Sequence, residues 1–141
     1  MYYLDSNIVI YHITDNAAYG KAAHRLMKRI AAREMEVCTS VYLFAEVFAT
    51  LRFFRKTTSE IYEHLKDLAN VGVIFVDLTP SIIIEALEQY RTGLKLGDAI
   101  HYTTAQLIGI PKIITEDKHF DTLEGVERLS LQKLQETAGS E

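Results

Sequence analysis

The sequence predicts an α/β protein in which helices cover both faces of a parallel sheet. Short apolar runs suited to strands alternate along the chain with longer segments whose apolar residues recur at helical spacing. Residues 73–76 form an unbroken apolar run, which is typical of a strand buried on both faces of a parallel sheet. The seven glycines and two prolines are dispersed over the 141 residues, so no linker divides the chain. We therefore expect a single domain over residues 1–135 and a flexible tail over residues 136–141.

Local patterns place the strands in order. The aromatic and apolar run at the start of the chain predicts the first strand. Apolar residues such as Leu26 and Ile30 recur at helical spacing and separate this strand from the next. Gly72 precedes the third strand, and the turn at Gly109 and Pro111 precedes the fourth. We expect strands at residues 2–4, 36–39, 73–76, 112–115 and 126–129.

Capping residues predict where the helices begin. Ser6 or Asn7 suits the N-cap of a short first helix, and Ser40 suits the N-cap of a longer one. Thr57 begins a capping-box pattern, and Pro80 stands where the first position of a helix tolerates proline. We expect helices at residues 6–13, 21–32, 41–54, 57–68, 80–92 and 97–108.

Composition excludes several classes of protein. Hydrophobic residues make up 48% of the chain, which indicates a globular protein. The 15 basic and 19 acidic residues give a net charge of −4, which excludes a strongly basic nucleic-acid-binding protein but permits a local basic patch. The single cysteine, Cys38, excludes an intrachain disulfide and a zinc finger, and we expect it in the core of a protein from a reducing compartment. Without a signal-peptide pattern or a membrane-spanning stretch, a cytoplasmic protein is expected.

Acidic residues follow the predicted strands, where parallel sheets bind their ligands. Asp5 follows the first strand, and Glu116 and Asp117 follow the fourth. Asp98 opens a helix, and Glu46 is the only charged residue in an otherwise apolar helical run. No cation stands three or four positions from Glu46, so a local salt bridge cannot explain its presence there. These acids are candidates for a metal site at the carboxyl edge of the sheet.

Each acid also has a purely structural interpretation. Asp5 and Asp98 precede or open helices, where aspartate is an ordinary N-cap. Asp117 suits a turn, and Glu46 could lie on a narrow solvent-exposed stripe of its helix. Taken singly, these interpretations compete evenly with a functional one, but their coincidence at one predicted edge favours function.

Four short segments together resemble the PIN-domain family, most closely its small ribonuclease toxins of the VapC type. The segments are residues 4–8, 40–47, 96–99 and 115–120, with the acids in order along the chain. The resemblance implies a three-layer α/β/α sandwich around a parallel five-stranded sheet and divalent-metal-dependent cleavage of RNA. It implies that Asp5, Glu46, Asp98 and Asp117 are the catalytic residues and metal ligands, and that Thr115 shapes the site. Glu116, beside Asp117, leaves open which of the two faces the site.

The chemistry of the residues agrees with what the resemblance implies. Clustered carboxylates without thiols or paired histidines select hard cations, so Mg²⁺ or Mn²⁺ is the expected cofactor. Ser6 and Asn7 could orient Asp5 from a second layer around the ion, or could simply cap a helix. The resemblance also implies an antitoxin protein as partner and a homodimer.

An acidic protein that binds RNA needs a local cationic surface. Arg52, Arg55 and Lys56 at the end of the helix that carries Glu46, together with Lys118, are the candidates for phosphate contacts. Phe53 and Phe54 lie between these cations and could stack on bases, but we expect them in the core.

Other functions remain open. The chain could be a PIN-like RNA-processing nuclease that is not a toxin, a PIN-like fold used only for binding, or a receiver-like domain that accepts a phosphoryl group over Mg²⁺. The last is disfavoured because a single acid, Asp5, follows the first strand where a receiver has paired acids. His101 stands one turn from Asp98, where packing or surface exposure is the expected role.

Overall fold

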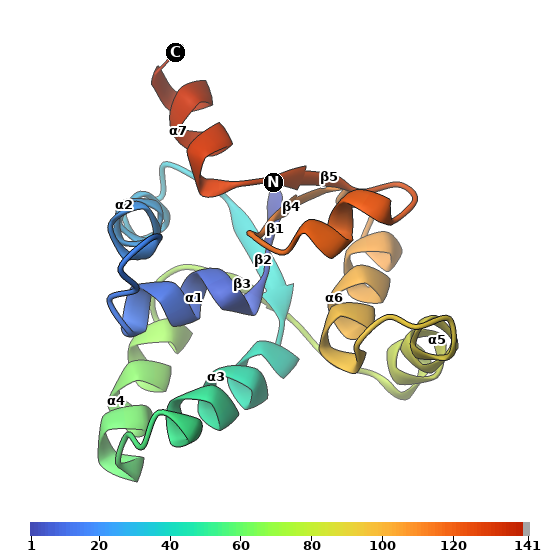
Figure 1. Cartoon of the computed structure of the whole chain (residues 1–141), viewed down its shortest axis with the longest axis horizontal. Coiled ribbons are helices and arrows are strands. Elements are labelled where there is room, and N and C mark those ends of the chain that lie inside the picture. The colour runs from blue at the N-terminus through green and yellow to red at the C-terminus, as the bar shows by residue number, and fades with distance from the viewer. Residues whose placement is uncertain (140–141) are drawn as a thin grey trace.

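The computed structural model describes residues 1–139, in which a five-stranded sheet lies between two layers of helices (Figure 1). The strand order is β3-β2-β1-β4-β5, and every neighbouring pair is parallel. The three-layer α/β/α fold with a parallel five-stranded sheet is therefore confirmed. The strands are β1 (Tyr2–Leu4), β2 (Val37–Ser40), β3 (Ile74–Val76), β4 (Lys112–Ile114) and β5 (Glu127–Leu129).

The helices begin close to where the capping residues predicted. Thr57 and Thr79 each accept a hydrogen bond from the backbone three residues on, and the Ser40 hydroxyl accepts one from the N–H of Tyr42. Two helices differ: the N-cap of the first is Asp5 and not Ser6 or Asn7, and the N-cap of the helix after β2 is Val41 and not Ser40. The helices are α1 (Ser6–Ile13), α2 (Gly20–Ala31), α3 (Tyr42–Phe53), α4 (Thr58–Ala69), α5 (Pro80–Arg91), α6 (Leu96–Leu107) and α7 (Leu131–Gly139), with a 3₁₀ turn η1 at Lys118–Thr122.

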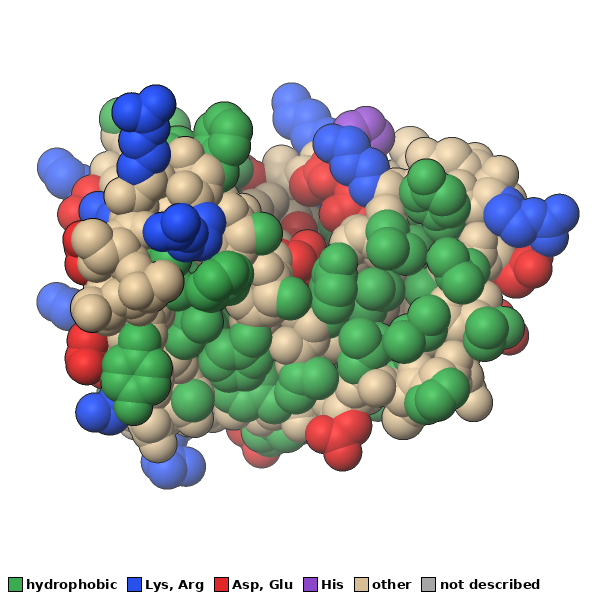
Figure 2. Space-filling view, turned by 90° about the horizontal axis from the view of Figure 1, so that it is seen from below, with side chains coloured by type: hydrophobic (Ala, Val, Ile, Leu, Met, Phe, Trp, Pro, Cys, Tyr) green, Lys and Arg blue, Asp and Glu red, His purple; other side chains and the backbone are tan. Residues whose placement is uncertain are grey.

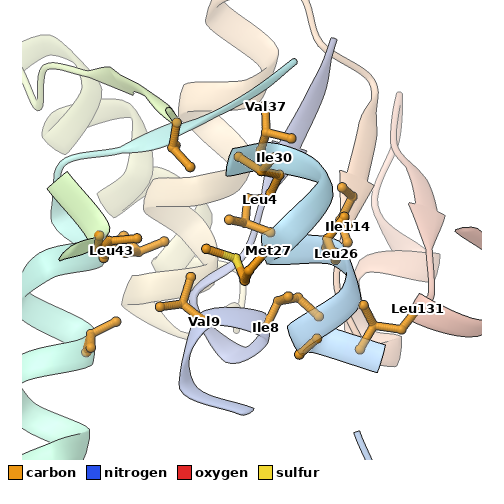
Figure 3. Close-up of a cluster of buried hydrophobic side chains, with 14 of the residues drawn as sticks. Leu4, Ile8, Val9, Leu26, Met27, Ile30, Val37, Leu43, Ile114 and Leu131 are labelled. Carbon is orange, nitrogen blue, oxygen red and sulfur yellow. The ribbon is translucent and has the colours of Figure 1, made fainter. Parts of the chain in front are cut away.

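Alternation along the strands divides the core between the two faces of the sheet. Leu4, Val37 and Ile114 face a large cluster built with α1 and α2 (Figure 3). Tyr3 and Cys38 face the opposite side, where α6 covers the sheet. Cys38 is buried, as expected, and burial raises the pKa of its thiol to about 11. Strands β1 and β2 therefore pack against helices on both faces of the sheet, which fixes the positions of their ends.

Two expectations about burial are wrong. The run at residues 73–76 forms an edge strand that pairs only with β2, and the Ile74 side chain is exposed. Phe53 and Phe54 are not core residues: they are 82% and 55% exposed at the end of α3. In both cases an apolar run predicts burial. The run itself does not tell whether another element covers it.

The C-terminal segment forms a helix that the sequence analysis did not expect. Residues 136–139 of the expected flexible tail belong to α7, which buries Leu131 and Leu134 and contacts α2. The rest of that expected tail, residues 140–141, lies outside the described residues. No helix within residues 1–139 has the length and the apolar character needed to cross a membrane.

Candidate functional site

The four predicted acids come from four different elements that meet at the carboxyl edge of the sheet. Asp5 follows β1 and Asp117 follows β4, and these two strands are neighbours. Glu46 lies in α3 and Asp98 in α6. Figure 2 views the molecule from the side toward which the β2 arrow points in Figure 1, and shows acidic side chains in a hollow with basic side chains at its rim.

The hydroxyl group of Thr115 connects the ends of β1 and β4. It donates a hydrogen bond of 2.7 Å to Oδ2 of Asp5 and accepts one from the backbone N–H of Asp117 at 3.0 Å. It also accepts one from Nδ2 of Asn7 at 3.2 Å. Oδ1 of Asp5 accepts the backbone N–H of Ser6 at 2.8 Å, which is the cap of α1. Asp5 is therefore the N-cap of α1, as its structural interpretation requires, while its role as a metal ligand stays a prediction.

Asp5 is only 4% exposed, and this burial governs its charge. Burial raises the pKa of the Asp5 carboxyl because the charged form loses hydration, and the charge of Glu46 adds to the rise. The positive charge of His101 and the hydrogen bond from Thr115 offset only part of it. An anion held in so little water favours a cation beside it.

Asp98 and Asp117 interact directly. Burial, followed by the charges of Asp5 and Asp117, raises the pKa of Asp98 to about 7, so near neutral pH its carboxyl can donate a hydrogen bond to Asp117. Burial also acts to raise the pKa of Asp117, but hydrogen bonds from the backbone and ring of His119, at 2.9 and 2.8 Å, lower it on balance. Asp98 is the third residue of α6, and its N-cap is Lys95, so the capping interpretation of Asp98 is wrong.

Glu46 is not on a solvent stripe but faces a buried histidine. Its Oε1 lies against Nε2 of His101, and Nδ1 of His101 lies 2.7 Å from the hydroxyl oxygen of Tyr3. The backbone N–H of Ser40 donates to that same oxygen at 3.1 Å. His101 is fully buried, and although burial acts to lower its pKa, the hydrogen bond and charge of Glu46 raise it on balance.

Glu116 and Asp117 point to different parts of the molecule. Oε1 of Glu116 accepts the backbone N–H of Leu131 at 2.7 Å and so caps the start of α7. The side chain of Asp117 instead contacts Asp98 and His119. Of the two neighbouring acids, only Asp117 therefore faces the other carboxylates.

Gly97 gives the carboxylate of Glu46 room beside α6. A Cβ atom at this position would lie 2.6 Å from Oε2 of Glu46, closer than such atoms approach one another. In the sequence, Gly97 indicates only a helix boundary. Gly97, Tyr3 and the role of His101 were missed because they act through contacts between distant segments, which no local pattern reveals.

The donor set fits a hard divalent cation in kind. It consists of carboxylate oxygens, and Oδ1 of Asn7 is a buried acceptor without a hydrogen-bond partner among the described residues. Such an atom beside Asp5 suits a water molecule of an ion's hydration shell. Within residues 1–139 no three acidic, histidine or cysteine side chains are arranged so that together they could hold a metal ion. The carboxylates instead pair with Thr115, His101 or each other.

The predicted RNA-binding cations are divided between two places. Lys118 directly follows Asp117 at the hollow. Arg52, Arg55 and Lys56 lie at the other end of α3, where it turns into α4 (Figure 1). There Arg52 donates to the carbonyl oxygen of Lys56, and Lys56 pairs with Glu60 at 3.9 Å. The structure does not bring these three cations to the carboxylates.

Comparison with known proteins identifies the class to which this fold and site belong. The family model of the PIN domain matches residues 2–126, and the chain belongs to the PIN domain family. A search of the curated proteins finds no match. The strand order, with β1 between β2 and β4, also differs from the 2-1-3-4-5 order of receiver-like domains, so that alternative is excluded.

Solved structures with this fold include proteins of toxin–antitoxin systems. One is the sarcin-ricin loop cleaving toxin VapC20 of Mycobacterium tuberculosis, with 18% identity, a TM-score of 0.71, and coverage of 86% of this chain and 93% of that one. Another is VapBC-1 of nontypeable Haemophilus influenzae, with 17% identity, a TM-score of 0.66, and coverage of 94% and 98%. A third is VapBC2 of Rickettsia felis bound to a promoter DNA fragment, with 15% identity, a TM-score of 0.66, and coverage of 92% and 97%. These likenesses establish a shared fold.

The raised pKa of Asp98 predicts how stability depends on pH without metal. The folded protein keeps a proton on Asp98 up to a pKa of about 7, whereas the unfolded chain releases it near the ordinary value of 3.8. Asp98 therefore makes stability fall as pH rises between these two values and adds no further change above them. The variant Asp98→Asn should show a shallower fall.

The measurement is thermal melting of both proteins in EDTA across that pH range. Comparing the two proteins removes contributions that they share, such as the raised pKa of Asp5. Identical slopes for the wild type and Asp98→Asn would contradict the crowding of these carboxylates.

The close approach at Gly97 predicts that Gly97→Ala displaces Glu46. The helix propensity of alanine, up to about 1 kcal/mol better than that of glycine, opposes the cost of loosening the contact between Glu46 and His101, so the variant should stay folded, which melting in EDTA checks. If Glu46 is a ligand, the variant should bind Mn²⁺ more weakly, as measured by calorimetric titration. The control is Gly97→Ala combined with Glu46→Gln, which should bind no more weakly than Glu46→Gln alone. Undiminished Mn²⁺ binding by Gly97→Ala would show that the carboxylate need not lie there.

Proposed function

We propose that the protein is a divalent-metal-dependent endoribonuclease and the toxin of a type II toxin–antitoxin pair. The observation that carries the proposal is the meeting of Asp5, Glu46, Asp98 and Asp117 at one edge of the sheet, around a buried carboxylate. Membership of the PIN domain family and the likeness to VapC-type structures support it.

The four acids would hold Mg²⁺ or Mn²⁺, and Ser6, Asn7 and Thr115 would hold the acids. A bound ion neutralises a phosphate and lowers the pKa of a water molecule for attack on it. Thr115 keeps Asp5 oriented through its 2.7 Å hydrogen bond, while Asn7 offers Oδ1 to water beside the carboxylates. The Ser6 backbone N–H fixes the other oxygen of Asp5.

RNA would cross the hollow with its phosphates near Lys118. Lys118 is exposed beside Asp117, so it can contact a phosphate without competing for the carboxylates. Arg52, Arg55 and Lys56 would contact a more distant part of the same RNA, because they lie at the far end of α3.

An antitoxin is the proposed protein partner. Exposed apolar side chains on α3 and α5 include Phe53, Ile84 and Tyr90, and Figure 2 shows hydrophobic side chains on both sides of the hollow. Apolar surface of this kind marks sites of protein–protein contact. An antitoxin covering it could place an arginine or lysine among the carboxylates. The likeness to VapBC-1 of Haemophilus influenzae and to a toxin-antitoxin complex from Klebsiella pneumoniae supports this partner. We also propose a homodimer, which the resemblance to the family implies.

RNA cleavage tests the proposal directly. The purified protein should cut RNA internally with Mg²⁺ or Mn²⁺ and be inactive in EDTA. Asp5→Asn and Asp98→Asn should each lose about 100-fold or more of the activity, because an amide binds a hard cation poorly and the ion supplies several kcal/mol of transition-state stabilisation. Glu116→Gln is the matched control and should stay active, since Glu116 faces α7. Undiminished cleavage in EDTA would overturn metal dependence.

Growth of cells that express the protein tests the toxin role. Expression of the wild type should slow growth, and Asp5→Asn should not, because it removes a proposed ligand while keeping a similar shape. Co-expression of the antitoxin should restore growth. Equal harm from the wild type and Asp5→Asn would reject the toxin role, and activity on RNA without harm would favour an RNA-processing nuclease.

A further inference from the structure

Glu46 receives no support from its own helix or from a strand end. The residues one turn away from Glu46 are uncharged. Glu46 reaches the edge of the sheet from helix α3 and not from a strand. A glutamate has three side-chain torsions, so a carboxylate left free would sample many positions. Yet its side chain is only 21% exposed, its Oε1 lies against His101, and its Oε2 occupies space beside α6 that a side chain at Gly97 would fill.

We infer that His101 is a positioning residue that, held by Tyr3, orients Glu46 toward the cation of the proposed site. The inference rests on the proposed function and deepens it. Nε2 of His101 lies against Glu46 Oε1, and Nδ1 lies 2.7 Å from the hydroxyl group of Tyr3. The two ring nitrogens point in fixed, divergent directions, so contact on one side determines the direction of the other. The chain of contacts thus runs from the backbone of Ser40 through Tyr3 and His101 to Glu46.

The rigidity of this chain comes from burial. Tyr3 and His101 are both 0% exposed, and their rings meet edge to face with centroids 5.6 Å apart. Tyr3 lies in β1, two residues before Asp5, so the same strand supports Asp5 directly and Glu46 through His101. His101 lies one turn after Asp98 on α6. The network therefore fixes Glu46 relative to the two elements that carry Asp5 and Asp98.

The direction of the hydrogen bonds follows from the donors available. The tyrosine oxygen accepts from the N–H of Ser40, and its own proton can be donated to Nδ1. Nε2 then carries a hydrogen and donates to Glu46. Nε2 also carries a hydrogen in the imidazolium form, so the contact with Glu46 is kept in either protonation state. Histidine residues oriented in this way by an outer partner, and carboxylates that they orient, affect metal affinity about 10–100-fold when the partner is removed.

Mn²⁺ affinity, measured by titration calorimetry or by the electron paramagnetic resonance of free Mn²⁺, tests the inference without relying on catalysis. His101→Asn places its amide near the Nδ1 position and cannot reach Glu46, so it should weaken Mn²⁺ binding by about 10–100-fold. His101→Gln can place an amide nitrogen near the Nε2 position and should retain more of the affinity than His101→Asn. Tyr3→Phe should weaken binding as well, because it leaves Nδ1 without its partner.

Tyr102→Phe is the matched control. Its hydroxyl group donates to the backbone of Glu124 on the surface, so Mn²⁺ affinity should not change. Melting in EDTA checks that each variant is folded, and if His101→Asn does not fold, His101→Gln and Tyr3→Phe carry the test. A merely structural role would lower the melting temperature while leaving the Mn²⁺ affinity of the folded protein unchanged, which would overturn the inference.

The double variant His101→Asn with Glu46→Gln separates this inference from the proposed function. If His101 acts through Glu46, the double variant should bind Mn²⁺ no more weakly than Glu46→Gln alone. Independent, additive losses would overturn the inference. If Glu46→Gln binds Mn²⁺ as tightly as the wild type, the inference is overturned as well. In that case the Mn²⁺ affinity of Asp98→Asn decides whether the proposed cation site still stands. Loss of affinity in Asp98→Asn keeps the site, and wild-type affinity there would reject both.

Discussion

The buried carboxylate of Asp5 is the constraint on which the rest of the site depends. A carboxylate with so little contact with water is stable only if hydrogen bonds and opposite charges surround it. The N-terminus of α1 supplies one partner through the Ser6 backbone, and Thr115 at the end of β4 supplies another. That second contact requires β4 beside β1, which the strand order provides. The hydrogen-bond partners of Asp5 therefore depend on the order of the strands in the sheet.

Crowding of acids around Asp5 places the fold under electrostatic strain when no cation is bound. Asp98 reduces this repulsion because its pKa is raised to about 7. Its carboxyl therefore keeps a proton near neutral pH and can donate it in a hydrogen bond to Asp117. Glu46 lies against His101, whose raised pKa favours the positively charged form that offsets the charge of Glu46. A bound cation would offset the repulsion between these carboxylates. It would stabilise the folded state by an amount set by its concentration relative to its Kd. Carboxylates crowded in this way reduce the stability of a fold when no cation is bound.

The sequence predicted the parts of the molecule that depend on local pattern. Strand positions followed from apolar runs, and Thr57 and Pro80 marked helix starts correctly, because their effects act within one turn. Asp5 and Asp117 could be placed at one edge because each follows a strand, whereas Glu46 was noticed as an unpaired charge in an apolar helix. What failed depends on distant segments: nothing near residues 73–76 shows that β3 is an edge, and nothing near Phe53 shows that no element covers it. The cap that Glu116 provides for α7 joins residues 15 positions apart, so local patterns left its direction open.

The case of Glu46 shows how an unexplained charge can be used to find a partner. Its helix offers no cation, so any partner had to come from another element, and the structure finds it 55 residues away in His101. Lysine would have been a poor choice there, since its flexible stem fixes no direction. Arginine would have presented several strong donors that compete with a metal ion for both oxygens of the carboxylate. Imidazole engages Oε1 alone, while the lack of a side chain at Gly97 leaves room for Oε2 beside α6. The carboxylate is therefore held in place yet keeps an oxygen available, which is what a metal ligand requires.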